Sequence, residues 1–151
     1  MSIWQARLPD ARFLDLFAGS GAVGIEALSL GAQQVVLVEK EPDAVAALET
    51  IRSSLDAGRL DIIRADLPPD LAKLGQQFHR LFDLVFADPP YEYTGYSEVI
   101  EGVEPLLTAN GQVAIEHEAG LLLSTQLVMM KQFDRRVYGD SAISFYSCRS
   151  D

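Results

Sequence analysis

Several kinds of residue are scarce in this chain, and each scarcity excludes a class of protein. The single Cys148 excludes an internal disulfide, and two well-separated histidines, His79 and His117, give no metal-ligand spacing. No uninterrupted apolar run approaches the roughly 18 residues that a membrane span requires. The first residues also lack the apolar stretch of a signal peptide. We therefore expect a soluble, cytoplasmic protein with neither a bound metal nor a membrane partner.

Basic charge is scarce as well, since 22 acidic residues stand against 12 basic ones and the net charge is −10. Long-range attraction of nucleic acid should be poor, because affinity for phosphates depends on cations and counterion release. A local patch could still suffice. Lys131, Arg135, Arg136 and Arg149 gather in the last quarter of the chain, where they form either an RNA-facing patch or an ordinary solvated surface.

Strand-like and helix-like segments alternate, which predicts an α/β fold with a doubly wound, mostly parallel sheet. A length of 151 residues and 48% hydrophobic composition fit one domain covering residues 1–151. Asn110 and Gly111 are expected to form a turn before the fifth strand, and residues 138–141 should join two final β segments in a closing antiparallel hairpin. The expected strands are Phe13–Phe17, Gln34–Glu39, Leu60–Arg64, Phe82–Ala87, Gln112–Glu116, Leu127–Val137 and Ala142–Cys148, and the expected helices are Val23–Leu30, Pro42–Leu55, Pro69–Leu74 and Tyr96–Leu107.

A glycine-rich loop follows the first expected strand. Gly19, Gly21 and Gly24 satisfy G-x-G-x-x-G between a strand and a helix, so the backbone can turn tightly and admit a nucleotide cofactor. Glu39 ends the second expected strand, 20 residues after Gly19, where an acid can accept both hydroxyls of a ribose. Together these residues predict a nucleoside site.

Asp15 indicates which nucleoside is bound. It lies four residues before Gly19, where a carboxylate would repel the pyrophosphate of a dinucleotide. A ligand with an ammonium and a sulfonium and without phosphate would instead be attracted. S-adenosyl-L-methionine is such a ligand. Asp15 could equally orient the glycine loop by accepting its amides, and the two roles are compatible.

The most informative segment is Asp88–Tyr91, Asp-Pro-Pro-Tyr, directly after the apolar run Leu84–Ala87. The two prolines lack amide donors, so the local backbone offers only acceptors, and Asp88 adds another. An exocyclic amino group on a base has two protons to donate, and Tyr91 could stack on its ring. The alternative is a proline-rich turn that ends a buried strand.

These motifs resemble the class I S-adenosylmethionine-dependent methyltransferases, and among them the group that methylates the exocyclic amine of a guanine in small-subunit ribosomal RNA. The matching segments are Leu14–Ala27, Val38–Lys40, Phe82–Tyr91 and Tyr138–Ala142. The resemblance implies a seven-stranded sheet with an antiparallel last strand, ribosomal RNA or an assembling small subunit as partner, and a monomer. That group carries an additional basic stretch before the first strand, and only 12 residues precede Phe13 here.

The resemblance also implies roles for single residues. Asp66 would accept the adenine amino group of the cofactor, although it could instead cap a helix. From their positions alone, Tyr93 and Tyr96 could line the base pocket or belong to a mobile loop. His117 follows the fifth strand at the same edge and is more typical of a polar loop residue than of a catalyst, and Phe17 fits the core better than base stacking. The expected catalytic residues are Asp88, Pro89, Pro90 and Tyr91, and the expected cofactor-binding residues are Asp15, Phe17, Ala18, Gly19, Gly21, Glu39, Lys40, Asp66 and Asp88.

The expected function is therefore methyl transfer from S-adenosyl-L-methionine to a guanine amine of small-subunit ribosomal RNA. Two alternatives stay open. One is the same chemistry on a DNA adenine or a protein glutamine, and the other is a cofactor-binding module without catalysis.

Overall fold

A computed structural model describes residues 2–55, 58–90 and 93–149 of the chain. Its strands form a seven-stranded sheet in the order β3-β2-β1-β4-β5-β7-β6, in which β1 to β5 pair in parallel and β7 is antiparallel to both neighbours. The doubly wound, mostly parallel sheet and its antiparallel C-terminal hairpin are thereby confirmed. The strands are β1 (Arg12–Leu16), β2 (Gln34–Glu39), β3 (Leu60–Arg64), β4 (Phe82–Ala87), β5 (Leu107–Glu118), β6 (Met130–Tyr138) and β7 (Ser141–Cys148).

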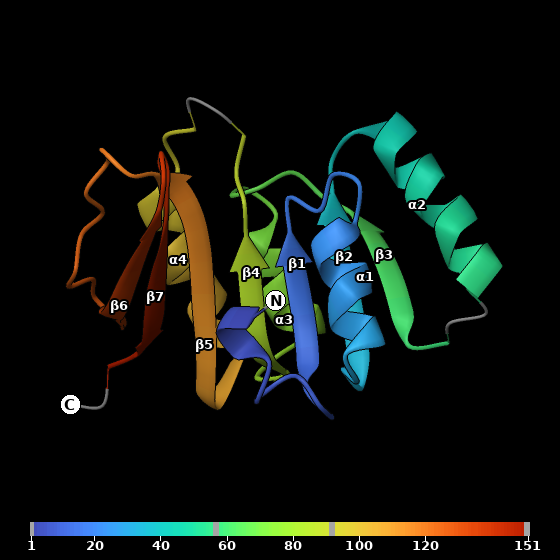
Figure 1. The fold of residues 1–151 in the computed structure, drawn as a ribbon, viewed down its shortest axis with the longest axis horizontal. Coiled ribbons are helices and arrows are strands. Elements are labelled where there is room, and N and C mark those ends of the chain that lie inside the picture. Colours follow the sequence, from blue (N-terminus) through green and yellow to red (C-terminus); the bar gives the residue numbers. More distant parts are fainter. Residues whose placement is uncertain (1, 56–57, 91–92, 150–151) are drawn as a thin grey trace.

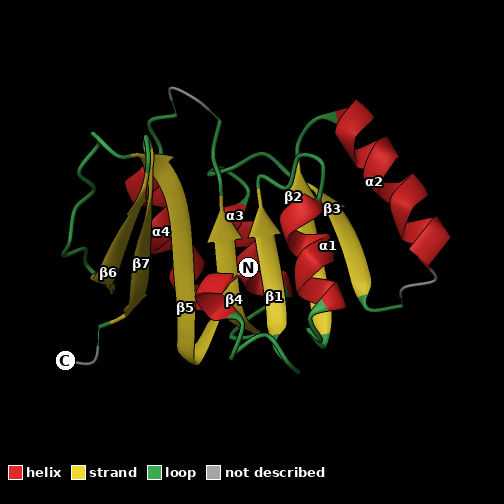
Figure 2. Cartoon of the chain, viewed as in Figure 1, coloured by secondary structure: helices red, strands yellow, loops and turns green. Residues whose placement is uncertain are grey.

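Helices cover both faces of this sheet (Figures 1 and 2). On one face, Trp4 of the short helix η1 (Ser2–Trp4), α1 (Ala22–Ser29) and α2 (Pro42–Leu55) share a core with alternate strand residues. On the other face, α3 (Leu71–Gln77), α4 (Tyr96–Val103) and η2 (Glu104–Leu106) enclose a second core. Among the described residues, the helices are too short or too polar to cross a membrane.

The central strands follow from their apolar runs. The structure has β2, β3 and β4 at their predicted bounds. The strands β2 and β4 are nearly continuous apolar segments buried between two helix layers, whereas β3 lies at the edge of the sheet and is only partly buried. The first strand ends at Leu16, one residue earlier than predicted. Phe17 has φ of 59°, a left-handed conformation that cannot continue a strand.

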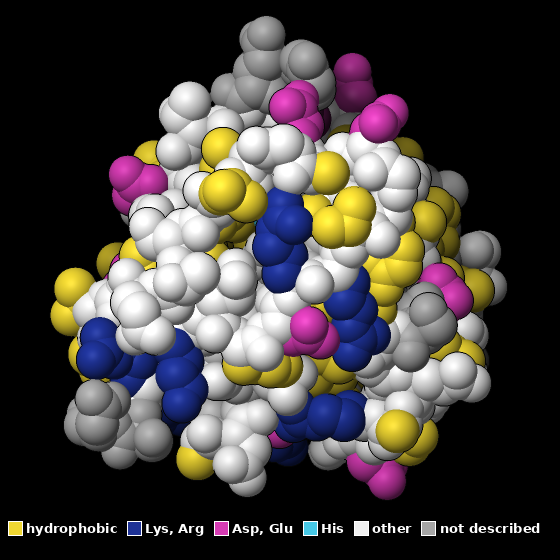
Figure 3. All heavy atoms as spheres, turned by 60° about the vertical axis from the view of Figure 1, so that its left-hand side comes forward, with side chains coloured by type: hydrophobic (Ala, Val, Ile, Leu, Met, Phe, Trp, Pro, Cys, Tyr) yellow, Lys and Arg dark blue, Asp and Glu magenta, His cyan; other side chains and the backbone are white. Residues whose placement is uncertain are grey.

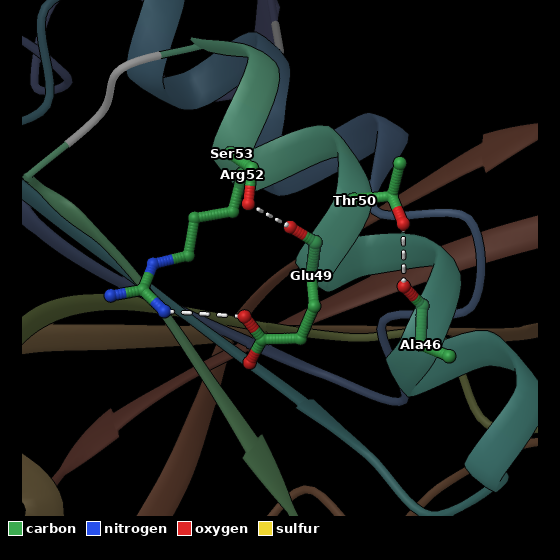
Figure 4. A network of polar contacts seen from close by, with 5 residues as sticks. All are labelled: Ala46, Glu49, Thr50, Arg52 and Ser53. Atoms are coloured by element: carbon green, nitrogen blue, oxygen red, sulfur yellow. Dashed lines mark hydrogen bonds and ion pairs between the residues drawn. The ribbon is translucent and has the colours of Figure 1, made fainter.

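The helix α2 also has its predicted bounds, with Pro42 in its first turn. Its exposed side is polar, and hydroxyls there donate to backbone carbonyls one turn earlier: Thr50 to Ala46 at 3.2 Å and Ser53 to Glu49 at 3.0 Å (Figure 4). Arg52 pairs with the Glu49 carboxylate at 3.2 Å. Leu48 is the buried residue that anchors this helix to the sheet.

The other helices differ from their predicted bounds. The helix α1 starts and ends one residue earlier than predicted, after Gly21 with φ of 79°. The helix α3 begins at Leu71 rather than at Pro69, because residues 66–70 form a turn in which the Asp70 amide donates to the Asp66 carbonyl at 2.9 Å. The helix α4 ends at Val103, and η2, which contains Pro105, follows it before β5 starts at Leu107. Proline breaks the regular α-helical hydrogen bonding there.

The prediction that Asn110 and Gly111 precede the fifth strand was wrong. Both lie within β5, which starts at Leu107, at a register shift between its pairing with Phe82 and its pairing with Leu84 of β4. The turn-forming residues therefore interrupt a strand instead of starting one. The following segment pairs with β4 at Gln112 to Ile115, as the apolar pattern predicts.

The C-terminal hairpin is confirmed, with a shorter first strand and a second strand that is one residue longer than predicted. The strand β6 starts at Met130 rather than Leu127, since Leu127 to Met130 form a tight connection in which the Leu127 amide donates to the Met130 carbonyl at 2.9 Å. The strand β7 starts at Ser141 and lies between β5 and β6.

Candidate active site

The order of strands places a binding site at one edge of the sheet. The chain winds from β1 through β2 to β3 on one side, and from β4 to β5 on the other, so the connections diverge between β1 and β4. In open α/β sheets, ligands bind beyond the carboxyl ends of the strands at this switch point. Two cavities occupy that edge, and Asp88, Pro90 and Tyr93 line both of them.

The first cavity, which we call the cofactor cavity, has a volume of about 510 Å³ and lies beyond β1 and β2. Most of the residues predicted to bind a cofactor line it. Sequence reasoning missed the apolar part of its wall, formed by Val38, Ala65 and Leu67, since an apolar residue at a strand end gives no separate signal. The predicted residues on its wall are Phe17, Gly19, Glu39, Lys40, Asp66 and Asp88.

Three other predicted cofactor residues lie behind this wall. Ala18 donates its amide to the Val38 carbonyl at 2.9 Å and so holds the loop on β2. A Cβ atom on Gly21 would lie 2.6 Å from Leu48 Cδ2, so Gly21 allows α2 to pack closely. Asp15 is only 2% exposed. These positions shape the cavity from below instead of lining it.

The three glycines of the motif therefore have different roles. Gly19 has φ of 55°, and a Cβ atom there would meet nothing within 4 Å. It faces open space at the cavity. A Cβ atom on Gly24 would overlap Leu37 Cδ2 and lie 3.2 Å from Val35 Cγ1, both side chains of β2. Gly19 thus leaves room for a ligand, and Gly24 leaves room for the sheet.

Gly24→Ala is expected to lower the free energy of unfolding by about 1–3 kcal/mol, because the added methyl group overpacks the contact between α1 and β2. Urea unfolding would measure this loss. Gly120→Ala is the matched control, because a Cβ atom there meets nothing within 4 Å and its φ is not in the left-handed region. Equal stability of the two variants would contradict the packing role of Gly24.

Glu39 joins the glycine loop to the end of β2. Its Oε1 accepts the Gly19 amide at 2.9 Å, and its Oε2 accepts the Glu41 amide at 2.9 Å. Each carboxylate oxygen has a further lone pair. Glu39 can therefore accept ligand hydroxyls while its orientation is held by the backbone.

Asp15 is held under the loop by a hydrogen bond from the Gly24 amide to its Oδ2 at 3.1 Å. Burial raises the pKa of Asp15 from 3.8 to about 7; the Gly24 hydrogen bond opposes this, while the negative charges of Asp88 and Glu39 add to it. The structure thus contains the loop-orienting contact that was one of the two roles expected for Asp15. A buried carboxylate this close to two others also favours a nearby cation.

Asp66 lies at the mouth of the cofactor cavity and is exposed. It does not cap α3, which begins five residues later, at Leu71. Its backbone amide instead donates a hydrogen bond to Oδ2 of Asp70 at 2.7 Å, which holds the backbone at Asp66 in place. Its carboxylate is left on the cavity wall, where a ligand amino group can reach it.

The second cavity, which we call the base cavity, has a volume of about 400 Å³ and lies beyond β4 and β5. Asp88 and Pro89 line it, and Tyr93 and Tyr96 supply aromatic surface. Sequence reasoning placed His117 at this edge but missed the rest of the far wall, since nothing in the sequence shows that the end of β5 and the hairpin meet here. That wall consists of Glu116, His117, Glu118, Leu121 and Ser141.

The residues of the Asp-Pro-Pro-Tyr segment have different surroundings. Asp88 and Pro90 are exposed, while Pro89 is buried. Although Asp88 is exposed as a residue, partial loss of solvent around its carboxyl group raises the pKa of Asp88 above its ordinary value. Tyr91 lies outside the described residues, so its stacking role stays a prediction.

Aromatic rings form the floor between the cavities. Tyr93 contacts Phe17 edge-on at a centroid distance of 5.2 Å and Tyr96 at 5.5 Å. Burial, then the charges of Glu98 and Asp66 and the nearby Tyr96, raise the pKa of Tyr93 to about 12, so its hydroxyl stays protonated. Phe17 packs against the core and also reaches the cofactor cavity.

His117 has a structural position in β5 rather than the loop position expected from sequence. Its Nδ1–H donates to the Glu118 carbonyl at 2.8 Å, so its Nε2 accepts the Ser144 hydroxyl at 2.7 Å. Burial is the main cause that lowers the pKa of His117. The neutral ring links β5 to β7 under the base cavity.

The charges of the cofactor cavity fit the predicted cofactor. Glu39, Glu41, Asp66 and Asp88 line it, and Lys40 is the basic residue among its described lining residues. Such a wall repels phosphate and attracts an ammonium or sulfonium. In the part of the chain that the structure describes, no three His, Cys, Asp or Glu residues gather in a group that could hold a metal ion.

The four basic residues predicted to gather do so around β6. Figure 3, which brings the β6 side of the molecule forward, shows Lys and Arg side chains among apolar ones. Arg136 is exposed, pairs with Asp134 at 3.0 Å and lies 5.1 Å from the Phe145 ring centroid. Arg135 donates to the Ala119 carbonyl. Lys131 is half-buried in β6, and Arg149 follows β7.

The sheet order, the loop and the strand-end acids are those of a class I S-adenosylmethionine-dependent methyltransferase. The family described as "Conserved hypothetical protein 95" matches residues 1–147, and the chain belongs to this family.

Known relatives agree with that assignment. The chain is 36% identical over 107 residues to "Ribosomal RNA small subunit methyltransferase D" of Escherichia coli. The aligned region covers 71% of this chain and 50% of the relative. The chain is 28% identical over 144 residues to "Putative rRNA methyltransferase YlbH" of Bacillus subtilis, over 91% of this chain and 76% of the relative. The chain thus spans only half the length of the Escherichia coli protein.

A solved structure also shares the fold. "Putative methyltransferase yhhF from Escherichia coli" superposes with a TM-score of 0.84 at 26% identity, covering 99% of this chain and 84% of the other. The expected resemblance to the small-subunit ribosomal RNA methyltransferase family is confirmed.

Proposed function

We propose that this protein transfers a methyl group from S-adenosyl-L-methionine to the exocyclic amine of a guanine in small-subunit ribosomal RNA. The observation that carries the proposal is the wall that Asp88, Pro90 and Tyr93 share between the two cavities. A donor in one cavity and a base in the other would meet at this wall. The printed names of the relatives support ribosomal RNA as the substrate.

The cofactor would be held by Glu39 and Asp66 through hydrogen bonds and by the apolar residues Val38 and Leu67 through contact. When bound, it supplies an electrophilic methyl group on a sulfonium. Gly19 leaves space for it next to the loop. The buried Asp15 carboxyl behind the glycine loop would favour its cationic groups.

Asp88 would act on the amine itself. The nitrogen of an exocyclic amine is a poor nucleophile because its lone pair is delocalised into the ring. Asp88 and the Pro89 carbonyl would accept its two protons and pull the nitrogen toward tetrahedral geometry, which localises the lone pair. The nitrogen then bonds to the methyl carbon as the bond from carbon to sulfur breaks, and one amine proton leaves to Asp88 or to water.

The base must be unpaired or flipped out, because an amine paired inside a duplex cannot reach Asp88. Tyr93 and Tyr96 supply aromatic surface in the base cavity on which a purine can rest. Tyr91 is proposed to hold the ring as well.

The proposal is tested by incubating the protein and labelled cofactor with small ribosomal subunits from cells that lack the enzyme, and by mapping the modified base. Label on the exocyclic amine of one guanine supports it. Label only on DNA adenine or on a protein glutamine would replace the proposed substrate. Tight cofactor binding without any methylated product would reduce the chain to a cofactor-binding module.

The β6 side of the molecule is proposed to contact the RNA backbone. Residues 119–149 contain four basic and two acidic residues, in a chain whose net charge is −10. Phe133 and Tyr138 are about half exposed on the same strand, at 47% and 52%. Cations with interspersed aromatic rings suit a phosphate backbone with unpaired bases.

Replacing both Lys131 and Arg136 by glutamine is expected to weaken RNA binding and to lower the slope of log affinity against log salt by about two, since each phosphate contact contributes about 0.9. Filter binding or fluorescence anisotropy across a salt series would measure this. Lys73→Gln is the control: it removes one positive charge on the exposed side of α3, away from β6, and should leave the slope unchanged. An unchanged slope in the double variant would place the RNA contact elsewhere.

A further inference from the structure

The base cavity contains a second carboxylate whose place next to Asp88 is fixed by the sheet. The strands β4 and β5 pair in parallel, with Phe86 opposite Ala114 and Ala87 opposite Ile115. The next step along both strands brings Asp88 beside Glu116. Neighbouring strands are about 4.8 Å apart, so Asp88, the first residue after β4, lies next to Glu116, which is still within β5.

The environment of Glu116 agrees with this register. Glu116 is half-buried and lines the base cavity together with Asp88. Burial first, and the charge of Asp88 second, raise the pKa of Glu116. Burial and the Asp88 charge are the influences on this carboxyl group, and no hydrogen bond or ion pair to it is found among the described residues. Its acceptor oxygens are therefore available to a ligand.

The chemistry of this pair matches one base edge. Guanine presents the N1 hydrogen directly beside its exocyclic amine, so two neighbouring groups of its edge are donors. Adenine places an acceptor nitrogen beside its amine. Carboxylates accept and cannot donate when ionised, and no Lys or Arg side chain is among the described residues that line the base cavity. The neighbouring carboxylates of Asp88 and Glu116 therefore favour an edge made of donors.

We propose that Glu116 determines base specificity by accepting the N1 hydrogen of the guanine whose exocyclic amine is held by Asp88. This proposal rests on the proposed function. A base with an acceptor at N1 would face the lone pairs of Glu116 without a proton between them, leaving both groups unpaired. The resulting discrimination is about 10-fold to 100-fold, as for other well-placed polar contacts to a base edge.

The test uses small ribosomal subunits reassembled on ribosomal RNA that carries guanine, diaminopurine or adenine at the nucleotide mapped above. Diaminopurine keeps the amine that guanine has but carries no hydrogen on N1. The protein is expected to methylate guanine at least 10-fold faster than diaminopurine. Glu116→Gln should lose most of this preference, because an amide can donate to the bare nitrogen. Asp140→Asn, which removes a carboxylate in the hairpin turn outside both cavities, should keep it.

The outcomes separate the two proposals. If guanine is methylated and Glu116→Gln keeps the preference of the unmodified protein, the role of Glu116 is overturned while the proposed function stands. If no substrate is methylated by the unmodified protein, the proposed function fails and the specificity role fails with it. A structural role alone would lower the rates on guanine and diaminopurine equally, so the ratio of the two rates is the deciding measurement.

Discussion

Asp88→Ala is expected to lower the rate of methyl transfer about 100-fold or more, which is the scale of losing a preorganised acceptor at the reacting group. The reason lies in the shared wall. Asp88 belongs to both cavities, and it is the acidic residue that does so among the described residues. Single-turnover transfer of labelled methyl groups measures the effect on the chemical step.

Binding measurements distinguish this effect from damage to the site. The affinity of Asp88→Ala for S-adenosyl-L-methionine, measured by calorimetry, should stay close to that of the unmodified protein, because Glu39, Asp66 and the apolar wall remain. Asp88→Asn keeps one acceptor oxygen and should recover part of the rate. Normal turnover by Asp88→Ala would refute amine activation by this carboxylate.

Asp15→Asn is expected to raise the free energy of unfolding at pH 8 by as much as about 4 kcal/mol, the free energy that corresponds to its pKa shift. In the folded protein the pKa of Asp15 is raised from 3.8 to about 7. The folded state therefore binds this proton more tightly than the unfolded chain. The stabilisation it gives is complete below pH 3.8, declines as the pH rises, and is lost above pH 7. Asparagine carries no charge and can still accept the Gly24 amide.

Urea unfolding at pH 4, 6 and 8 would measure this difference, which should grow with pH. Asp10→Asn serves as the control, because Asp10 is exposed and its left-handed φ of 64° suits asparagine. If Asp15 also attracts the cationic groups of the cofactor, the stabilised variant should bind S-adenosyl-L-methionine more weakly. If Asp15→Asn were less stable than the unmodified protein at pH 8, favourable interactions of the ionised Asp15 carboxylate would outweigh the cost of burying its charge.

The strands at the centre of the sheet could be predicted from sequence because their signal is local. An apolar run such as Gln34–Glu39, bounded by polar residues, has one stable place, between two helix layers. Boundaries failed where backbone conformation decided them, as at Phe17 with its positive φ and at the Asp66–Asp70 turn. Asn110 and Gly111 show that turn-forming residues can also lie within a strand.

The candidate site was predictable where one strand end supplies a motif and hidden where two segments meet. Asp88 and Gly19 belong to local patterns, so the sequence indicates them. Glu116 was expected only as the last residue of the fifth strand, because its position beside Asp88 follows from the pairing of β4 with β5. The different roles of Gly19, which leaves room for a ligand, and Gly24, which allows close packing, likewise depend on which side chains surround each glycine.

The outer position of β6 has a consequence for how copies of this chain behave at high concentration. A strand at the end of a sheet offers unpaired backbone groups on which another strand could assemble. Here the Thr125 carbonyl accepts the Gln132 amide at 2.8 Å, so the preceding loop covers the first part of that strand. Further along, the register shift beside Phe133 bends the backbone, and Arg135 and Arg136 add like charges. These features oppose edge-to-edge pairing of one copy of this chain with another.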